Sequence, residues 1–97
     1  MHRGDIFIVD DNSNNLAVLA GILQDGGFQV RAANTGRRAL AIVALDPPEL
    51  IMLDVQMPEL NGYDVCLKLK ANEATQSIPV IFISALDDVS DKVRAFE

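Results

Sequence analysis

Short apolar runs that end at a polar residue most constrain how this chain can fold. Three such runs cover residues 6–9, 50–53 and 78–84 of the 97-residue sequence. Uninterrupted runs of this length are typical of strands buried on both faces, as in a parallel sheet. Asp54 follows the second run, and open α/β sheets bind ligands beyond the carboxyl ends of their strands. The sequence therefore predicts a carboxylate at the mouth of a buried sheet.

The segments between these runs carry helix signals. Apolar residues recur at helical spacing within residues 16–23, 39–43, 63–70 and 89–96. A shorter alternating segment, residues 28–33, predicts a partly exposed edge strand. The order βαβαβαβα predicts one doubly wound α/β domain over residues 1–97, with a parallel sheet, right-handed crossovers and helices on both faces.

Charge and hydropathy argue against contact with nucleic acid and with a membrane. The formal net charge of −6 argues against a nucleic-acid contact by this segment. No apolar run is long enough to cross a membrane, and the N-terminus does not resemble a signal peptide. We therefore expect no membrane contact and a cytoplasmic location.

Polar groups from separate predicted strands converge on one edge of the sheet. The first strand delivers Asp10 and Asp11, the third Asp54, and the fourth Ser84. Clustered carboxylates repel one another, and a hard divalent cation such as Mg²⁺ would relieve that repulsion. Asp54 could then act as a nucleophile that forms an aspartyl-phosphate. Alternatively, each aspartate is an ordinary strand-end or helix-cap residue, and any one alone is weak evidence of a site.

Three sequence motifs, in order and together spanning most of the chain, resemble a known family. They are VDDN at residues 9–12, LDVQMP at 53–58 with Asn61 and Gly62, and PVIFISA at 79–85. This combination resembles the CheY-like receiver domain of two-component response regulators. The resemblance implies a flavodoxin-like fold with strand order 2-1-3-4-5. It also implies that Asp54 accepts a phosphoryl group from the phosphohistidine of a sensor histidine kinase or phosphotransfer protein.

The same resemblance implies a role for each polar residue at the sheet edge. Asp11, Asp54 and the backbone carbonyl of Gln56 would ligate Mg²⁺ directly, with Mn²⁺ as a possible substitute, and Asp10 would act through a water. Ser84 would take the position of the switch hydroxyl that contacts the phosphoryl group. Such a domain is a signalling module rather than an enzyme, with self-catalysed phosphotransfer and dephosphorylation only.

The C-terminus departs from the family pattern. The family continues with a fifth strand that carries a lysine and a switch aromatic, and then a fifth helix, none of which is in these residues. Without a fifth strand, residues 78–84 would form an unpaired apolar edge, which is a template for pairing with another chain. For a chain that ends at Glu97, we therefore expect a homodimer or higher assembly. The output domain or effector is not identified by the sequence.

Two alternative functions follow from the same residues. A haloacid dehalogenase-type phosphatase also places a nucleophilic aspartate after a buried strand, but it needs a second aspartate two residues on, where this chain has Gln56. A pseudo-receiver would keep the fold as a binding module without cycling phosphate. The missing lysine favours the pseudo-receiver, whereas Asp10, Asp11, Asp54 and Ser84 favour the phospho-acceptor.

Overall fold

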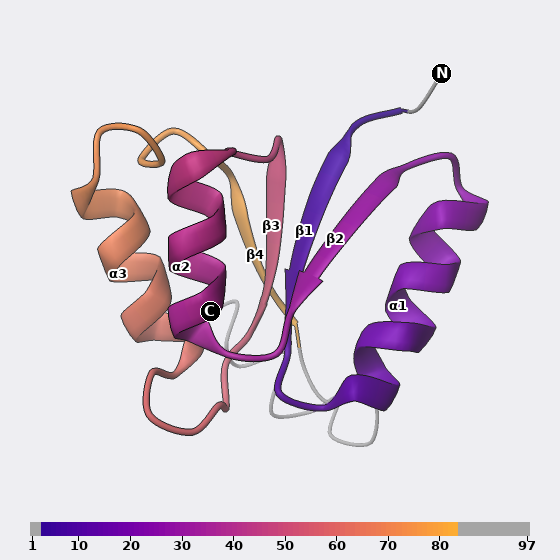
Figure 1. Ribbon diagram of the computed structural model, residues 1–97, viewed down its shortest axis with the longest axis horizontal. Helices are drawn as coiled ribbons and strands as arrows, with labels where there is room; N and C mark the ends of the chain where they lie inside the picture. Colours follow the sequence, from indigo (N-terminus) through magenta and orange to yellow (C-terminus); the bar gives the residue numbers. More distant parts are fainter. Residues whose placement is uncertain (1–2, 84–97) are drawn as a thin grey trace.

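A parallel sheet of four strands forms the centre of the computed structural model, which describes residues 3–83 (Figure 1). The strands are β1 (Asp5–Val9), β2 (Gln29–Ala33), β3 (Leu50–Asp54) and β4 (Val80–Ile83). Their order in the sheet is β2-β1-β3-β4, and every neighbouring pair is parallel. This arrangement confirms the predicted α/β class and the predicted strand order 2-1-3-4.

Helices cover both faces of the sheet, as the alternating pattern predicts. They are α1 (Ser13–Asp25), α2 (Gly36–Leu45) and α3 (Gly62–Ala71). Figure 1 shows α1 on one side of the sheet and α2 with α3 on the other. Each helix begins at a residue whose side chain accepts hydrogen bonds from the first turn, namely Asn12, Thr35 and Asn61. The fourth helix predicted at residues 89–96 lies outside the described residues.

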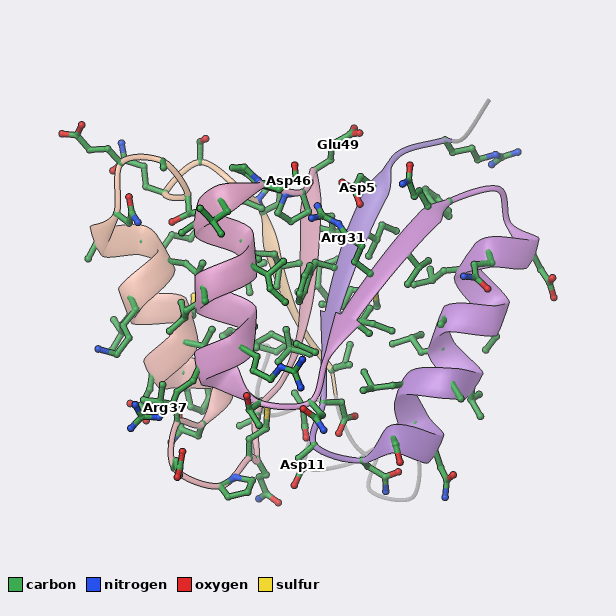
Figure 2. All side chains as sticks on the ribbon, viewed as in Figure 1. Asp5, Asp11, Arg31, Arg37, Asp46 and Glu49 are labelled. Carbon is green, nitrogen blue, oxygen red and sulfur yellow. The ribbon has the colours of Figure 1, made fainter. Side chains whose placement is uncertain are left out.

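The main core fills the space between the sheet and α2 with α3. Alternate residues of β1 and β3 point to this side and are fully buried against the two helices, apart from Asp5 at the start of β1, which is partly exposed beside Arg31 (Figure 2). The strands contribute Phe7, Val9, Ile51 and Leu53, and the helices contribute Ala39, Val43, Val65 and Leu69. The opposite face differs, because no residue of α1 is fully buried and Ile22 remains 62% exposed.

The fourth strand differs from its predicted limits. The sequence predicts one buried strand over residues 78–84, but β4 begins at Val80 and none of its residues is fully buried. Pro79 has no N–H to give to a strand ladder, although its carbonyl accepts the Ile51 N–H at 3.0 Å. Ile78 is buried in the core without being part of the strand. Within residues 3–83, no helix is long and apolar enough to span a membrane.

Candidate functional site: an acidic cluster at the carboxyl ends of the strands

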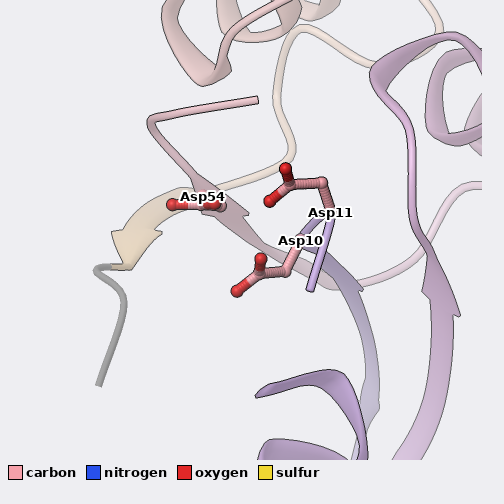
Figure 3. A group of neighbouring side chains, drawn as sticks. All are labelled: Asp10, Asp11 and Asp54. Carbon is pink, nitrogen blue, oxygen red and sulfur yellow. The ribbon is translucent and has the colours of Figure 1, made fainter. Parts of the chain in front are cut away.

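Strand register brings the predicted carboxylates together. Val9 of β1 lies opposite Leu53 of β3, so Asp10 and Asp54 come one position later on neighbouring strands. Asp11 follows in the loop to α1. Carboxylate oxygens of all three aspartates lie within 4.8 Å of one another (Figure 3). Asp10 is 2% exposed and Asp54 is 6% exposed, whereas Asp11 is open to solvent.

Asp10 is held by the first turn of α1. The backbone N–H of Asn12 donates to Asp10 Oδ1 at 3.0 Å, and the side-chain amide of Asn15 donates to Asp10 Oδ2 at 3.4 Å. Both donors come from the segment that enters the helix, so the start of α1 fixes the plane of this buried carboxylate. The sequence motifs did not single out Asn15. Its only signal was its place in the first turn of a helix that starts beside Asp10.

Asp54 sits where β3 meets a loop that folds back on itself. The Gln56 N–H donates to Asp54 Oδ1 at 3.4 Å, and the Gly62 N–H donates to the Val55 carbonyl at 2.8 Å. A Cβ atom added to Gly62 would overlap the Asp54 carbonyl oxygen and would come within 2.9 Å of Val55 Cα. Only glycine therefore allows the start of α3 to pack this closely against the end of β3.

A pocket of about 530 Å³ lies beside the acidic cluster. It is formed by the loop after β3, the first turn of α3 and one of the aspartates. Its lining residues are Asp11, Val55, Gln56, Met57, Pro58, Asn61 and Tyr63. The Tyr63 ring packs on Phe82 of β4, with 5.0 Å between ring centroids. This pocket leaves the cluster accessible from the side of Asp11.

The donor set at the cluster fits a hard cation. All three side chains offer carboxylate oxygens, which are the ligands that Mg²⁺ and Ca²⁺ prefer. Asp10 and Asp54 are buried at the ends of β1 and β3, while exposed Asp11 leaves room for water to complete a coordination shell. The triad could therefore bind a metal ion. Gln56 is exposed and borders the same pocket, and Ser84 lies outside the described residues.

Most of the functional residues that the sequence singled out lie in this one region. The predicted gathering of Asp10, Asp11 and Asp54 is confirmed. The parallel strand order 2-1-3-4 with helices on both faces is that of the flavodoxin-like receiver fold.

Comparison with known proteins leads to the same class. The family model described as "Response regulator receiver domain" matches residues 6–97. The chain therefore belongs to the response regulator receiver domain family, as its motifs indicated. Members of this family generally act as signalling modules rather than as enzymes, and they partner with a histidine kinase.

Curated relatives resemble the chain over a small part of their own length. The response regulator PleD of Caulobacter vibrioides is 41% identical over 92 residues, covering 95% of this chain and 20% of PleD. A probable cyclic di-GMP phosphodiesterase of Vibrio cholerae is 40% identical over 93 residues, covering 95% of this chain and 21% of that protein. The probable transcriptional regulator ycf27 of Cyanophora paradoxa is 37% identical, covering 100% of this chain and 39% of that regulator.

Solved structures share the fold. The signal receiver domain of a histidine kinase from Syntrophus aciditrophicus is 39% identical, with a TM-score of 0.81, and the match covers 97% of this chain and 71% of that one. The N-terminal domain of a receiver protein from Methanoculleus marisnigri has a TM-score of 0.83 at 23% identity, covering 98% and 94% of the two chains. At that low identity the second structure supports the fold alone.

Proposed function

We propose that this chain is a phospho-acceptor signalling switch in which Asp54 takes a phosphoryl group from the phosphohistidine of a sensor kinase or phosphotransfer protein. The observation that carries the proposal is the close group of three carboxylates, all within 4.8 Å of one another, at the strand ends of a receiver fold. Family membership supports it, because receiver domains partner with histidine kinases.

The chemistry needs a carboxylate that is rigidly held and can be reached. A carboxylate oxygen of Asp54 would attack the phosphorus, and the phosphorus–nitrogen bond of the phosphohistidine would break. The departing imidazole nitrogen keeps the electron pair and takes up a proton. Asp54 ends a buried strand and its Oδ1 accepts the Gln56 N–H, so its orientation is set before the donor arrives. Phosphoryl transfer relies on this kind of positioning and on charge stabilisation more than on covalent help.

A divalent cation completes the proposal. We propose Mg²⁺, with Mn²⁺ as a substitute, held by Asp11, Asp54 and the Gln56 carbonyl, with Asp10 acting through a water. When bound, the cation would offset the negative charge of the carboxylates and of the phosphoryl oxygens. Ser84 is proposed as the switch hydroxyl that contacts the phosphoryl group, and it lies beyond the described residues.

The relatives differ in the activity that their names describe, so they do not indicate one output for this switch. Their names describe a cyclic di-GMP phosphodiesterase and transcriptional regulators, although the same segment of this chain matches all of them. This sharing supports an input role for the matched segment, with the effector supplied by another part of the protein or by a partner. No specific observation in the described part of the structure favours the dehalogenase-type phosphatase or the pseudo-receiver.

Acetyl phosphate provides a direct test of Asp54. With Mg²⁺, the protein should gain one phosphoryl group by intact-mass spectrometry, and the gain should disappear in Asp54→Ala. Asp25→Ala is the matched control, because Asp25 is an exposed carboxylate at the far end of α1, and its labelling should equal that of the wild type.

Two results would count against the proposal. Label that persists in Asp54→Ala would assign the phosphoryl group to another residue. A correctly folded wild-type protein that takes no label from acetyl phosphate or from any phosphorylated kinase would instead favour the pseudo-receiver.

A further inference from the structure

The first turns of α1 and α3 begin alike and then diverge. Each has an asparagine as its N-cap, Asn12 and Asn61. Three residues later α3 has Asp64, whose side chain accepts the Asn61 N–H and completes a reciprocal capping box. At the equivalent position α1 has Asn15, and its first turn contains no acidic residue. A carboxylate at that position would interact favourably with the helix dipole, so its absence from α1 needs another cause.

The Asn15 side chain serves the acidic cluster instead of the helix end. Its Nδ2 lies 3.4 Å from Asp10 Oδ2, and because a carboxylate only accepts hydrogen bonds, the NH₂ group must face Asp10. The Asn12 side chain already accepts the backbone N–H groups of Asn14 and Asn15 at 2.9 and 3.1 Å. The turn is therefore capped without help from the side chain at position 15.

Charge explains why an amide suits this position. An aspartate here would be a fourth carboxylate beside three that already lie within 4.8 Å of one another. A lysine would donate to Asp10, but it would cancel the negative charge that attracts a cation. Asparagine donates a hydrogen bond to the buried carboxylate and leaves the charge of the cluster unchanged.

We propose that Asn15 is a positioning residue for the acidic cluster: its amide orients Asp10 for cation binding. The inference deepens the proposed function, on which its metal-binding part rests. Outer partners that orient the groups around a metal typically change its affinity by about 10- to 100-fold when they are removed. Asn15 acts through Asp10 and is not itself placed in contact with the cation or the phosphoryl group.

Metal affinity is the first test, measured by titration with Mn²⁺ alone. Because Asp10 itself would reach the cation through a water, Asn15→Ala should weaken Mn²⁺ binding several-fold and by no more than about tenfold. Asn15→Gln, which keeps an amide donor, should recover part of the loss. Asn14→Ala is the matched control, because Asn14 is exposed on the same turn and its side chain is not among the donors to Asp10. Wild-type affinity in Asn15→Ala, or equal losses in the Asn14 and Asn15 variants, would overturn the proposal.

The second test measures the stability of the metal-free protein. It distinguishes our proposal from the alternative that Asn15 only stabilises the first turn of α1. If position 15 serves only the helix, Asn15→Asp should raise the urea midpoint, because an acid there suits the dipole and the cap. If Asn15 serves Asp10, the same isosteric change should lower the midpoint, because it removes the donor and adds a like charge. A raised midpoint would overturn the inference.

The two tests also separate this inference from the proposed function. A wild-type protein that binds no Mn²⁺ would refute the metal site itself. The urea comparison would still decide whether Asn15 holds Asp10 in place.

Discussion

Gly62→Ala provides the sharpest test of how the site is built. The added Cβ would overlap the Asp54 carbonyl oxygen and would come within 2.9 Å of both the Asp54 carbonyl carbon and Val55 Cα. Carbon atoms pack best at about 3.5–4.0 Å, so the start of α3 must move away from the end of β3. All of these atoms belong to the backbone, which yields far less readily than the end of a side chain.

The magnitude follows from two opposing effects. Alanine in place of glycine stabilises by about 0.4–1 kcal/mol through the unfolded chain, whereas forcing an extra carbon into a packed site costs about 1–3 kcal/mol and occasionally more. Because the contact is with backbone, we expect the upper part of that range and a net loss of about 2 kcal/mol in the free energy of unfolding. For a domain of this size, that loss lowers Tm by about 8–16 °C.

Two other glycines serve as controls in the same urea-unfolding assay. A Cβ on Gly21, within α1, meets nothing within 4 Å, so Gly21→Ala should stabilise by about 1 kcal/mol through helix propensity. A Cβ on Gly36 would come within 2.7 Å of a methyl group of Val65, which is a contact with a side chain and leaves the backbone at a greater distance. The expected order of stability is Gly21→Ala, wild type, Gly36→Ala, Gly62→Ala. A Gly62→Ala protein as stable as the wild type would refute the close-approach argument.

Two further predictions concern α3 and the cluster. Thr75 is 2% exposed and its hydroxyl donates to the Leu69 carbonyl at 2.7 Å, so Thr75→Val should lower the free energy of unfolding by about 1 kcal/mol in urea titrations; an unchanged value would mean that this hydrogen bond contributes little. Asp11→Ala should weaken Mg²⁺ or Mn²⁺ binding more than Asp10→Asn does in calorimetric titration, and an unchanged affinity in Asp11→Ala would remove Asp11 from the metal shell.

The sequence predicted those features that depend on local pattern. Continuous apolar runs indicated β1 and β3 because a parallel sheet needs strands that are apolar on both faces. The gathering of Asp10, Asp11 and Asp54 followed from strand order, since the carboxyl ends of parallel strands meet at one edge. Both were confirmed.

Features that depend on contacts between distant segments were not predicted. Asn15 looked like an ordinary first-turn residue, because its partner is defined only once α1 docks beside β1. Gly62 looked like part of a loop motif, because its contact with the end of β3 depends on the path of the intervening loop. That path includes Glu59, which adopts a φ of +65° that few residues other than glycine take up. The predicted start of β4 at Ile78 was wrong, because the apolar run continues through Pro79, which has no N–H to donate to a strand ladder.

No residue of α1 is fully buried, and yet its first turn holds one of the site's carboxylates. A helix with so few buried contacts can unfold locally while the sheet stays folded. Local unfolding of α1 would remove the two hydrogen bonds that hold Asp10. Any cation that binds only the closed form must then stabilise α1 as well, by about 2.7 kcal/mol at a concentration 100 times its Kd. Occupancy of the site and local unfolding of α1 are thus two coupled equilibria, so amide exchange in α1 would report on the metal.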